Sequence, residues 1–256
     1  MPKVAILSDI HGNLHALRVV LREVGTSGAE HLAVAGDIIG YGANPRECVD
    51  LLQKVGAQVV FGNHESYAVL IQREGRSGLE ADWQSSPVYA GIVHALGQLS
   101  AGQMQWLRNL PWMQRVAPAA VMAHSTLHHP EKWHYLHSEK DARPTLDLMQ
   151  SKSVDLAFFG HTHQQEWFAH PDALAQPVPE DQYRLHLPEG SICAVTAGAV
   201  GQPRGGDGDS RATWVLWDTD CRVIEFRKTS YPVDRAMQAI LDAGLPEESA
   251  KRLMVP

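Results

Sequence analysis

The stretch VAILSDIHGNLHALRVVLREV, residues 4–24, predicts a strand, a turn and a helix in immediate succession. Its first seven residues form a short apolar run rich in β-branched side chains, as expected of a strand buried in a sheet. Apolar residues then recur at helical spacing from Leu14 to Val24, and Asn13 is a suitable N-cap for that helix. The chain therefore begins with a strand and a helix in the order of a βαβ unit.

The same pattern continues to residue 64. HLAVAGDI (31–38) and AQVVFGNH (57–64) are two further apolar runs, and Pro45 suits the first position of a helix between them. The order strand, helix, strand, helix, strand is typical of parallel βαβ units, so this part of the chain predicts an α/β fold.

The rest of the chain is mixed in character. Residues 72–86 predict a loop, and residues 125–141 form a polar excursion that contains aromatic residues. The other expected elements are helices over 87–110, over 142–151 and after Asp234, strands over 119–124 and 154–161, and an antiparallel set of strands over 191–200, 212–218 and 223–231. Without an internal repeat or a clean linker, we expect one domain over residues 1–256 with mixed α/β (α+β) character.

Composition limits the classes of partner. The 256 residues carry a formal net charge of -7, which argues against a broad surface for nucleic acid or membranes. Cys48, Cys193 and Cys221 are isolated and odd in number, so neither a disulfide framework nor a thiolate zinc site is indicated, and a reducing, cytoplasmic location is expected. The opening MPKVAILSDI is too quickly polar for a signal peptide, and no apolar run approaches membrane-spanning length.

Polar side chains follow every one of the five predicted strands up to residue 163. They are Asp9 and His11, then Asp37, then Asn63 and His64, then His124, and finally His161 and His163. Taken singly, each has an ordinary explanation as a helix cap, a turn residue or a hydrogen-bonded side chain. Ligands of open α/β sheets bind beyond the carboxyl ends of the strands, so these groups are expected to converge on one site.

The residue types in this set favour metal binding. The set contains only nitrogen and oxygen donors, which suits Mn, Fe, Ni, Zn or Co better than a closed structural zinc site. There are too many ligands for one ion with an open position and about enough for two. A carboxylate shared between two ions is the simplest way to hold them roughly 3.5–4 Å apart.

The motifs also resemble those of a known family. DIH at 9–11, GD at 36–37, GNH at 62–64, the single His124 and GHTH at 160–163 resemble the calcineurin-like metallophosphoesterases, and the resemblance extends from Asp9 to about Arg204. GDIIGYGANPRECVDLL and AVGQPRGGD look like the small bacterial and archaeal phosphodiesterase-like branch. The resemblance implies a four-layer α-β-β-α sandwich of two mixed β-sheets flanked by helices.

The resemblance also assigns roles to residues. It implies that Asp9, His11 and His163 hold one divalent ion, that Asn63, His124 and His161 hold the other, and that Asp37 bridges them. His64 is not expected to ligate and would donate a proton to the leaving oxygen or stabilise phosphoryl charge. A hydroxide between the ions would attack phosphorus in line with the leaving group. Tyr41 and Arg204 are candidate substrate contacts, although the stretch around Arg204 equally suits a turn.

Departures from the family leave alternatives open. The related Ser/Thr protein phosphatases carry an aspartate and two arginines where this chain has Gly40, Tyr41 and Phe61, so bidentate arginine contacts to phosphate are missing there. The likeness to the phosphodiesterase-like branch implies small phosphate esters as substrates, with phosphodiesters favoured and nucleotides among the candidates. Protein or phosphomonoester phosphatase activity is the alternative, followed by a non-catalytic metal-binding scaffold. The net charge and the chain length argue against a nuclease.

The segment 125–141 admits two interpretations. His128, His129, His134 and His137 suit either an additional metal or phosphate site or, preferably, exposed positions in a loop near the pocket mouth. Trp133 or Tyr135 is able to stack on a nucleobase, whereas packing of the loop is the simpler explanation.

Overall fold

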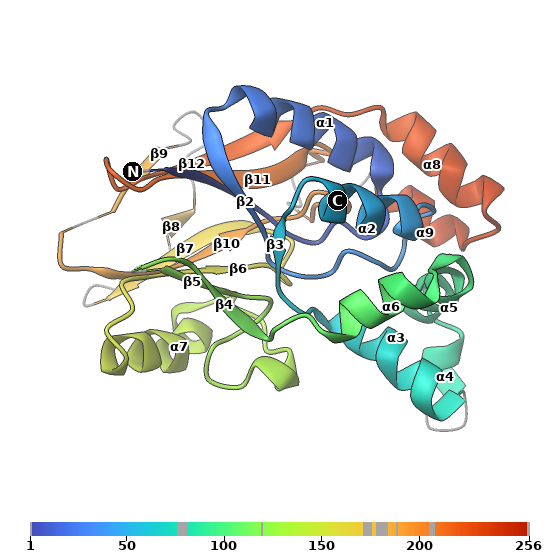
Figure 1. Ribbon diagram of the computed structural model, residues 1–256, viewed down its shortest axis with the longest axis horizontal. Coiled ribbons are helices and arrows are strands. Elements are labelled where there is room, and N and C mark those ends of the chain that lie inside the picture. The colour runs from blue at the N-terminus through green and yellow to red at the C-terminus, as the bar shows by residue number, and fades with distance from the viewer. Residues whose placement is uncertain are drawn as a thin grey trace.

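Two β-sheets lie face to face in the computed structural model, with helices on both outer sides (Figure 1). The structure describes residues 2–75, 81–118, 120–170, 176–177, 184–187, 189–204 and 208–254. Within these residues no helix is both long and apolar enough to cross a membrane.

The first sheet contains the opening βαβ units. Its strands, in spatial order, are β3 (Gln58–Val59), β2 (Ala29–Val34), β1 (Lys3–Leu7), β11 (Ala212–Asp218), β12 (Val223–Thr229) and β9 (Arg184–His186). The strands β1, β2 and β3 are parallel, as predicted, whereas β11, β12 and β9 add to them in antiparallel fashion.

The second sheet is also mixed. Its strands, in spatial order, are β4 (Met113–Ala117), β5 (Ala120–Ala123), β6 (Leu156–Phe159), β10 (Ile192–Ala197), β7 (Gln165–His170) and β8 (Gln176–Pro177). The strands β5, β6 and β10 are parallel, and the pairs β4–β5, β10–β7 and β7–β8 are antiparallel.

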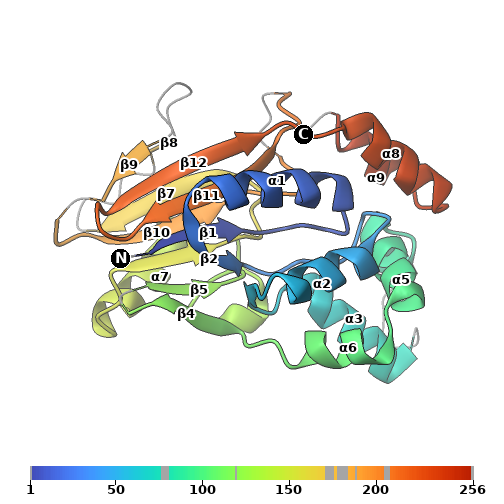
Figure 2. The same ribbon diagram turned by 45° about the horizontal axis from the view of Figure 1, so that its top comes forward.

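Three buried apolar clusters separate the four layers. Alternate residues of one strand point to opposite faces, so in β1 the side chains of Val4 and Ile6 lie in the cluster between the sheets, while Leu7 faces the helices. In β6, likewise, Phe158 lies between the sheets and Phe159 packs towards α7. Both faces of these strands are buried, which explains why they appear in the sequence as continuous apolar runs. The expected four-layer arrangement is confirmed (Figure 2).

The helices gather mainly at one end of the sandwich and on its outer faces (Figure 1). They are α1 (Leu14–Thr26), α2 (Pro45–Lys54), α3 (Asn63–Glu74), α4 (Ala81–Gln84), α5 (Pro87–Gln98), α6 (Ala101–Arg108), α7 (Glu139–Ser151), α8 (Val233–Asp242) and α9 (Glu247–Lys251). Two predictions of helix starts are confirmed: the Asn13 side chain accepts the N–H of Ala16 at the start of α1, and α2 begins at Pro45.

Some boundaries differ from the sequence-based prediction. The segment 72–86 is not simply a loop, because α3 extends to Glu74 and α4 lies within it, while residues 76–80 are outside the described part. The predicted helix over 87–110 is two helices, since Ser100 caps a new helix, α6, through the N–H of Gln103. The predicted strand over 57–64 ends at Val59, and the next helix begins at Asn63.

The antiparallel prediction for the last third is only partly correct. The strands β11 and β12 do pair antiparallel, but β10 lies in the other sheet, parallel to β6. Nearly all residues of β10 are buried, as expected of an inner strand that is covered on both faces. The sequence around β10 does not indicate that the chain passes from one sheet to the other at this point.

Candidate metal centre

The carboxyl ends of the parallel strands of both sheets meet at one place. Asp9 and His11 follow β1, Asp37 follows β2, Asn63 and His64 follow β3, His124 follows β5, and His161 and His163 follow β6. All of these side chains are buried. The structure thus brings together every candidate metal ligand that the sequence suggested, and His64 with them.

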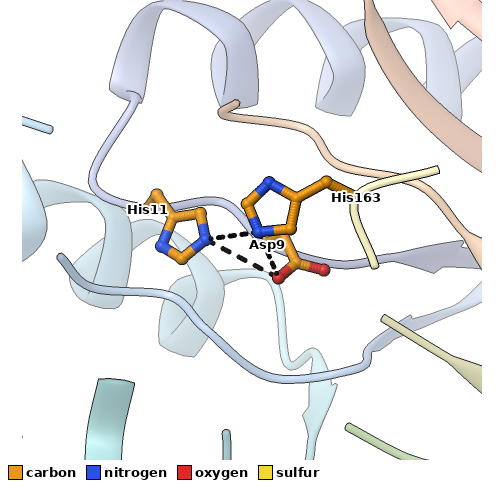
Figure 3. Close-up of side chains that lie close together, drawn as sticks. All are labelled: Asp9, His11 and His163. Carbon is orange, nitrogen blue, oxygen red and sulfur yellow. Dashed lines mark hydrogen bonds and ion pairs between the residues drawn. The ribbon is translucent and has the colours of Figure 1, made fainter. Parts of the chain in front are cut away.

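A first group is formed by Asp9, His11 and His163 (Figure 3). Asp9 Oδ2 accepts hydrogen bonds from Ser8 Oγ at 2.6 Å and from the backbone N–H of His161 at 2.9 Å. Its buried Oδ1 has no hydrogen-bond partner among the described residues and lies 3.2 Å from His163 Nε2 and 3.6 Å from His11 Nε2. The two Nε2 atoms are 3.2 Å apart.

Backbone carbonyls fix the tautomers of four histidines. A carbonyl only accepts, so in the neutral ring the nitrogen beside it carries the hydrogen and the other nitrogen keeps its lone pair. The pairs are His11 Nδ1 with Ile39 O at 3.1 Å, His124 Nδ1 with Ala35 O at 2.7 Å, His163 Nδ1 with Gln202 O at 2.6 Å, and His161 Nε2 with Trp133 O at 2.9 Å. The facing Nε2 atoms of His11 and His163 are therefore both acceptors. A cation bound between them would remove the repulsion between their lone pairs.

A second group lies on the other side of Asp37. Asp37 Oδ2 is 3.4 Å from His124 Nε2 and 3.8 Å from His11 Nε2, so this one oxygen faces both groups. Asn63 Oδ1 lies 2.9 Å from His124 Nε2, and His161 belongs to the same group. Ligands about 2.1 Å from one metal lie roughly 3.0–3.4 Å from each other, close to the separations within both groups.

The backbone at these residues is unusual. Asp9, His11, Asp37, His161 and His163 all have positive φ, between 49° and 68°. Such a conformation costs a non-glycine residue about 1–2 kcal/mol, and clusters of it typically occur where a fold holds side chains for a function.

The negative charges of the buried Asp9 and Asp37 carboxylates also favour binding of a cation. Burial opposes ionisation of Asp37, but the imidazoles of His124, His64 and His11 outweigh it and hold its pKa well below the usual range. The pKa of Asp9 is lowered in the same way, mainly by His163. Burial acts to lower the pKa of His124, but Asp37 raises it to about 9. Buried anions require compensation, and divalent cations held by these donors fit that requirement.

Glu65 is a site residue that the analysis of the sequence missed. Its fully buried carboxylate accepts the backbone N–H groups of Asp37 at 2.9 Å, Ile38 at 2.9 Å, Ile39 at 3.2 Å and Gly62 at 3.1 Å. Burial and the Asp37 carboxylate raise its pKa to about 7, while the N–H groups act in the opposite direction. Glu65 therefore ties the Asp37 turn to the Asn63 turn. The glutamate at the third position of α3 was the available signal.

Glu65→Gln is expected to destabilise the protein by about 1–3 kcal/mol and to weaken metal binding. An amide retains one acceptor oxygen and turns an NH₂ towards two backbone N–H donors, so the turn carrying Asp37 loses its support. Urea unfolding of the metal-free protein and a Mn²⁺ titration measure the two effects. The exposed Glu30→Gln is the matched control, expected to stay within about 0.5 kcal/mol of the wild type. Equal stability and equal metal affinity in Glu65→Gln and the wild type would contradict this role.

His64 differs from the other histidines of the centre. Its Nε2 lies 3.8 Å from Asp37 Oδ2, near enough to form a further group with His11 and Asp37. Its buried Nδ1, however, has no hydrogen-bond partner among the described residues. Burial lowers the pKa of His64 to about 3, which leaves a neutral ring with one N–H to donate.

The two candidate substrate residues lie beside one another. Tyr41 is 6% exposed, and its ring packs against His11 and His64 at centroid distances of 4.8 and 4.9 Å. Arg204 Nη2 lies 3.5 Å from the Tyr41 hydroxyl and donates to Gln202 Oε1 at 3.1 Å. Residues 205–207 of the stretch around Arg204 lie outside the described part.

The segment 125–141 covers one side of the centre. Trp133 stacks on Trp112 at 5.2 Å, which supports packing of the loop, and its carbonyl holds His161. Tyr135 stacks on the His161 ring at 4.1 Å and remains 47% exposed. Among the residues that the structure describes, the candidate metal groups do not include His128, His129, His134 or His137.

Comparison with known proteins shows the family of this chain. A family model described as calcineurin-like phosphoesterase matches residues 2–165. The uncharacterized protein MJ0912 of Methanocaldococcus jannaschii is 30% identical over 255 residues, which cover 98% of this chain and 97% of that protein.

Solved structures show the same architecture. The crystal structure of a metallophosphoesterase from Sphaerobacter thermophilus is similar with a TM-score of 0.81 and 31% identity, covering 99% of each chain. A hypothetical protein, PH1004 from Pyrococcus horikoshii OT3, shares the fold with a TM-score of 0.77 at 18% identity, covering 100% of this chain and 98% of that one. Because the family model spans more than half of the chain, this protein belongs to the calcineurin-like phosphoesterase family, whose members are metal-dependent phosphoester hydrolases.

Proposed function

We propose that this protein hydrolyses small phosphate esters, phosphodiesters in preference to monoesters and nucleotides among the candidates, with two divalent ions of Mn, Fe, Ni or Zn. The observation that carries the proposal is the position of Asp37 Oδ2 between two groups of lone-pair donors, one with His11 and one with His124. Asp9, His11 and His163 would hold one ion, and Asn63, His124 and His161 the other. When bound, two such ions neutralise phosphoryl oxygens and generate a nucleophile from water near neutral pH.

The protein's own groups have two tasks in this proposal. The carbonyl-anchored histidines and Asp9, whose Oδ2 is held by Ser8 and the His161 amide, keep their donor atoms in place before metal or substrate arrives. His64, which has no such anchor among the described residues, would donate a hydrogen bond from its Nε2–H to the leaving oxygen and so stabilise the negative charge that develops there as the ester bond breaks.

Tyr41 and Arg204 form the proposed contact with the rest of the substrate. The Arg204 guanidinium carries the positive charge on this side of the centre, and the Tyr41 hydroxyl beside it is a neutral donor whose pKa is raised by burial. Together they suit the non-bridging oxygens of a phosphate ester.

Phosphodiesters are favoured because arginines are absent from two further positions. These positions hold Tyr41 and Phe61, whose ring packs against Trp112 at 5.1 Å, so neither position supplies a cation. A diester has one negative charge fewer than a fully ionised monoester and therefore needs fewer cationic contacts. The same absence weakens the alternative of a protein phosphatase.

Two broader expectations accompany the proposal. A cytoplasmic location suits the three cysteines, which are all free, with Cys48 and Cys193 buried. One domain over residues 1–256 suits the packing of Ala236, Ile240 and Leu253 from the C-terminal helices into the same apolar cluster as α1.

Chelated enzyme that receives Mn²⁺, Ni²⁺, Zn²⁺ or Mg²⁺ is expected to hydrolyse bis-p-nitrophenyl phosphate with a kcat/KM at least about tenfold above that for p-nitrophenyl phosphate. The monoester brings additional negative charge, which Tyr41 and Phe61 do not balance at the positions where the related protein phosphatases carry arginine. Release of p-nitrophenolate measures both reactions, and enzyme kept in chelator is the control.

A preference for the monoester would favour the phosphatase alternative. Absence of turnover with all of the metals, in a protein that binds two ions, would favour the non-catalytic scaffold.

A further inference from the structure

No described residue forms a hydrogen bond with Nδ1 at the back of the His64 ring. Its Nδ1 faces Gly40, where an added Cβ would lie 2.0 Å from Nδ1 and 2.8 Å from Cε1. No side chain fits at position 40, which has φ of 94°, and the carboxylate that the protein phosphatases carry at this place is excluded sterically. Other contacts must therefore orient the His64 ring.

Aromatic rings surround His64 instead. The ring centroids of His11, Tyr41 and Tyr67 lie 4.5, 4.9 and 6.1 Å from that of His64, with interplanar angles of 63°, 49° and 54°. These are the distances and tilted or edge-on orientations that aromatic pairs prefer. The imidazole is thus confined from several sides, while its Nε2 remains directed towards Asp37.

The supporting rings continue into the helices that follow. Tyr67 of α3 meets Trp83 of α4 edge-on at 5.2 Å, and Trp83 meets Tyr89 of α5 edge-on at 5.4 Å. Gly91 of α5 lies against the backbone of Tyr41, where an added Cβ would be 2.2 Å from Tyr41 N. The helices between β3 and β4 therefore support both Tyr41 and Tyr67.

We propose that Tyr41 and Tyr67 are positioning residues that hold the catalytic His64 by ring packing, in place of the carboxylate of the related phosphatases. This inference rests on the proposed function, since it assumes that His64 acts on the leaving group. It requires the ring of Tyr67, not its hydroxyl, so phenylalanine satisfies it and leucine does not.

The dependence of the rate on the leaving group distinguishes this positioning role from a merely structural one. Help from His64 matters more as the leaving oxygen becomes more basic, so a misdirected His64 slows methyl phenyl phosphate more than methyl p-nitrophenyl phosphate. General damage to the fold or to metal binding slows both esters alike. The comparison keeps the retained methyl group constant.

The experiment compares Tyr67→Leu, Tyr67→Phe and the wild type in the Mn²⁺-loaded protein. Tyr67→Leu is expected to lower kcat on methyl phenyl phosphate by about tenfold to 10²-fold, to lower it clearly less on methyl p-nitrophenyl phosphate, and to leave the metal content unchanged. Tyr67→Phe is expected to stay within about twofold of the wild type on both. In a His64→Ala background, Tyr67→Leu is expected to add no further loss, because both changes remove the same contribution.

Trp106→Leu on α6 is the structural control, since Trp106 packs against the same apolar cluster. Tyr41→Leu measured against Tyr41→Phe, both of which lack the hydroxyl proposed to contact the substrate, repeats the comparison from the other side of His64 and covers the case in which Tyr67→Leu does not fold. Equal losses on both esters, or a loss that persists without His64, would overturn the positioning role while leaving the proposed function intact. Absence of metal-dependent turnover in the wild type would instead contradict the proposed function.

Discussion

Asp37→Asn is expected to reduce turnover by about 10³-fold or more, because a cation pair contributes several kcal/mol to the reaction and each 1.36 kcal/mol is a factor of ten. Asp37 Oδ2 is the oxygen that faces both His11 and His124. Its Oδ1 accepts the backbone N–H of His64 at 2.9 Å, a bond that an asparagine oxygen is able to keep. The substitution therefore replaces the shared donor by an NH₂ group with little disturbance of the turn.

Three measurements define this result. Circular dichroism is expected to show an unchanged fold, metal analysis a loss of bound ion, and kinetics on bis-p-nitrophenyl phosphate the loss of turnover at saturating Mn²⁺. Asp50→Asn, which alters an exposed carboxylate on α2 that bonds to Gln103, is the control and is expected to stay close to the wild type. Two ions bound and turnover within tenfold of the wild type in Asp37→Asn would rule out a bridging role.

His64→Ala is expected to lower kcat by about 10²–10⁴-fold while both ions remain bound, the range that a positioned acid or base contributes. The geometry alone allows His64 to be counted with His11 and Asp37 as a ligand. Within the described part of the chain its Nδ1 has no carbonyl partner, which separates it from the four histidines that we assign as ligands. Metal content measured beside kcat decides between these roles.

The control for this variant is His31→Ala, which removes an exposed histidine from β2. It is expected to change neither quantity. If the His64→Ala protein lost one ion and its turnover fell only in proportion to the lost metal, His64 would be a metal ligand. Its assignment as the donor to the leaving group would then be wrong.

The site was more predictable than the surrounding fold. Parallel strands of one sheet end at the same edge, so residues such as Asp9 and Asp37 are expected to meet once their strands are recognised. The hydrogen bonds between histidine ring nitrogens and backbone carbonyls could not be predicted, because the sequence does not indicate which carbonyl a histidine faces. Glu65 was missed for the same reason: its four partners are backbone N–H groups.

The errors in the fold have a common physical origin. The strand β10 joins the second sheet beside β6 because its two faces fill two different apolar clusters, with Val195 in one and Ala194 in the other. An apolar run indicates that a strand is buried, but it does not indicate which neighbouring strand it pairs with. The early end of β3 arises similarly, since Asn63 and His64 sit in the first turn of α3, where a local pattern of apolar residues resembles a longer strand.

Titration of the chelated wild-type protein with Mn²⁺ tests the central claim most directly. Turnover of bis-p-nitrophenyl phosphate and bound metal are followed together as the ratio of metal to chain increases. The two groups joined by Asp37 predict that turnover is negligible without metal and reaches its plateau when two ions are bound per chain. A plateau at one ion per chain, or full turnover in the chelated protein, would contradict a dinuclear phosphoesterase centre.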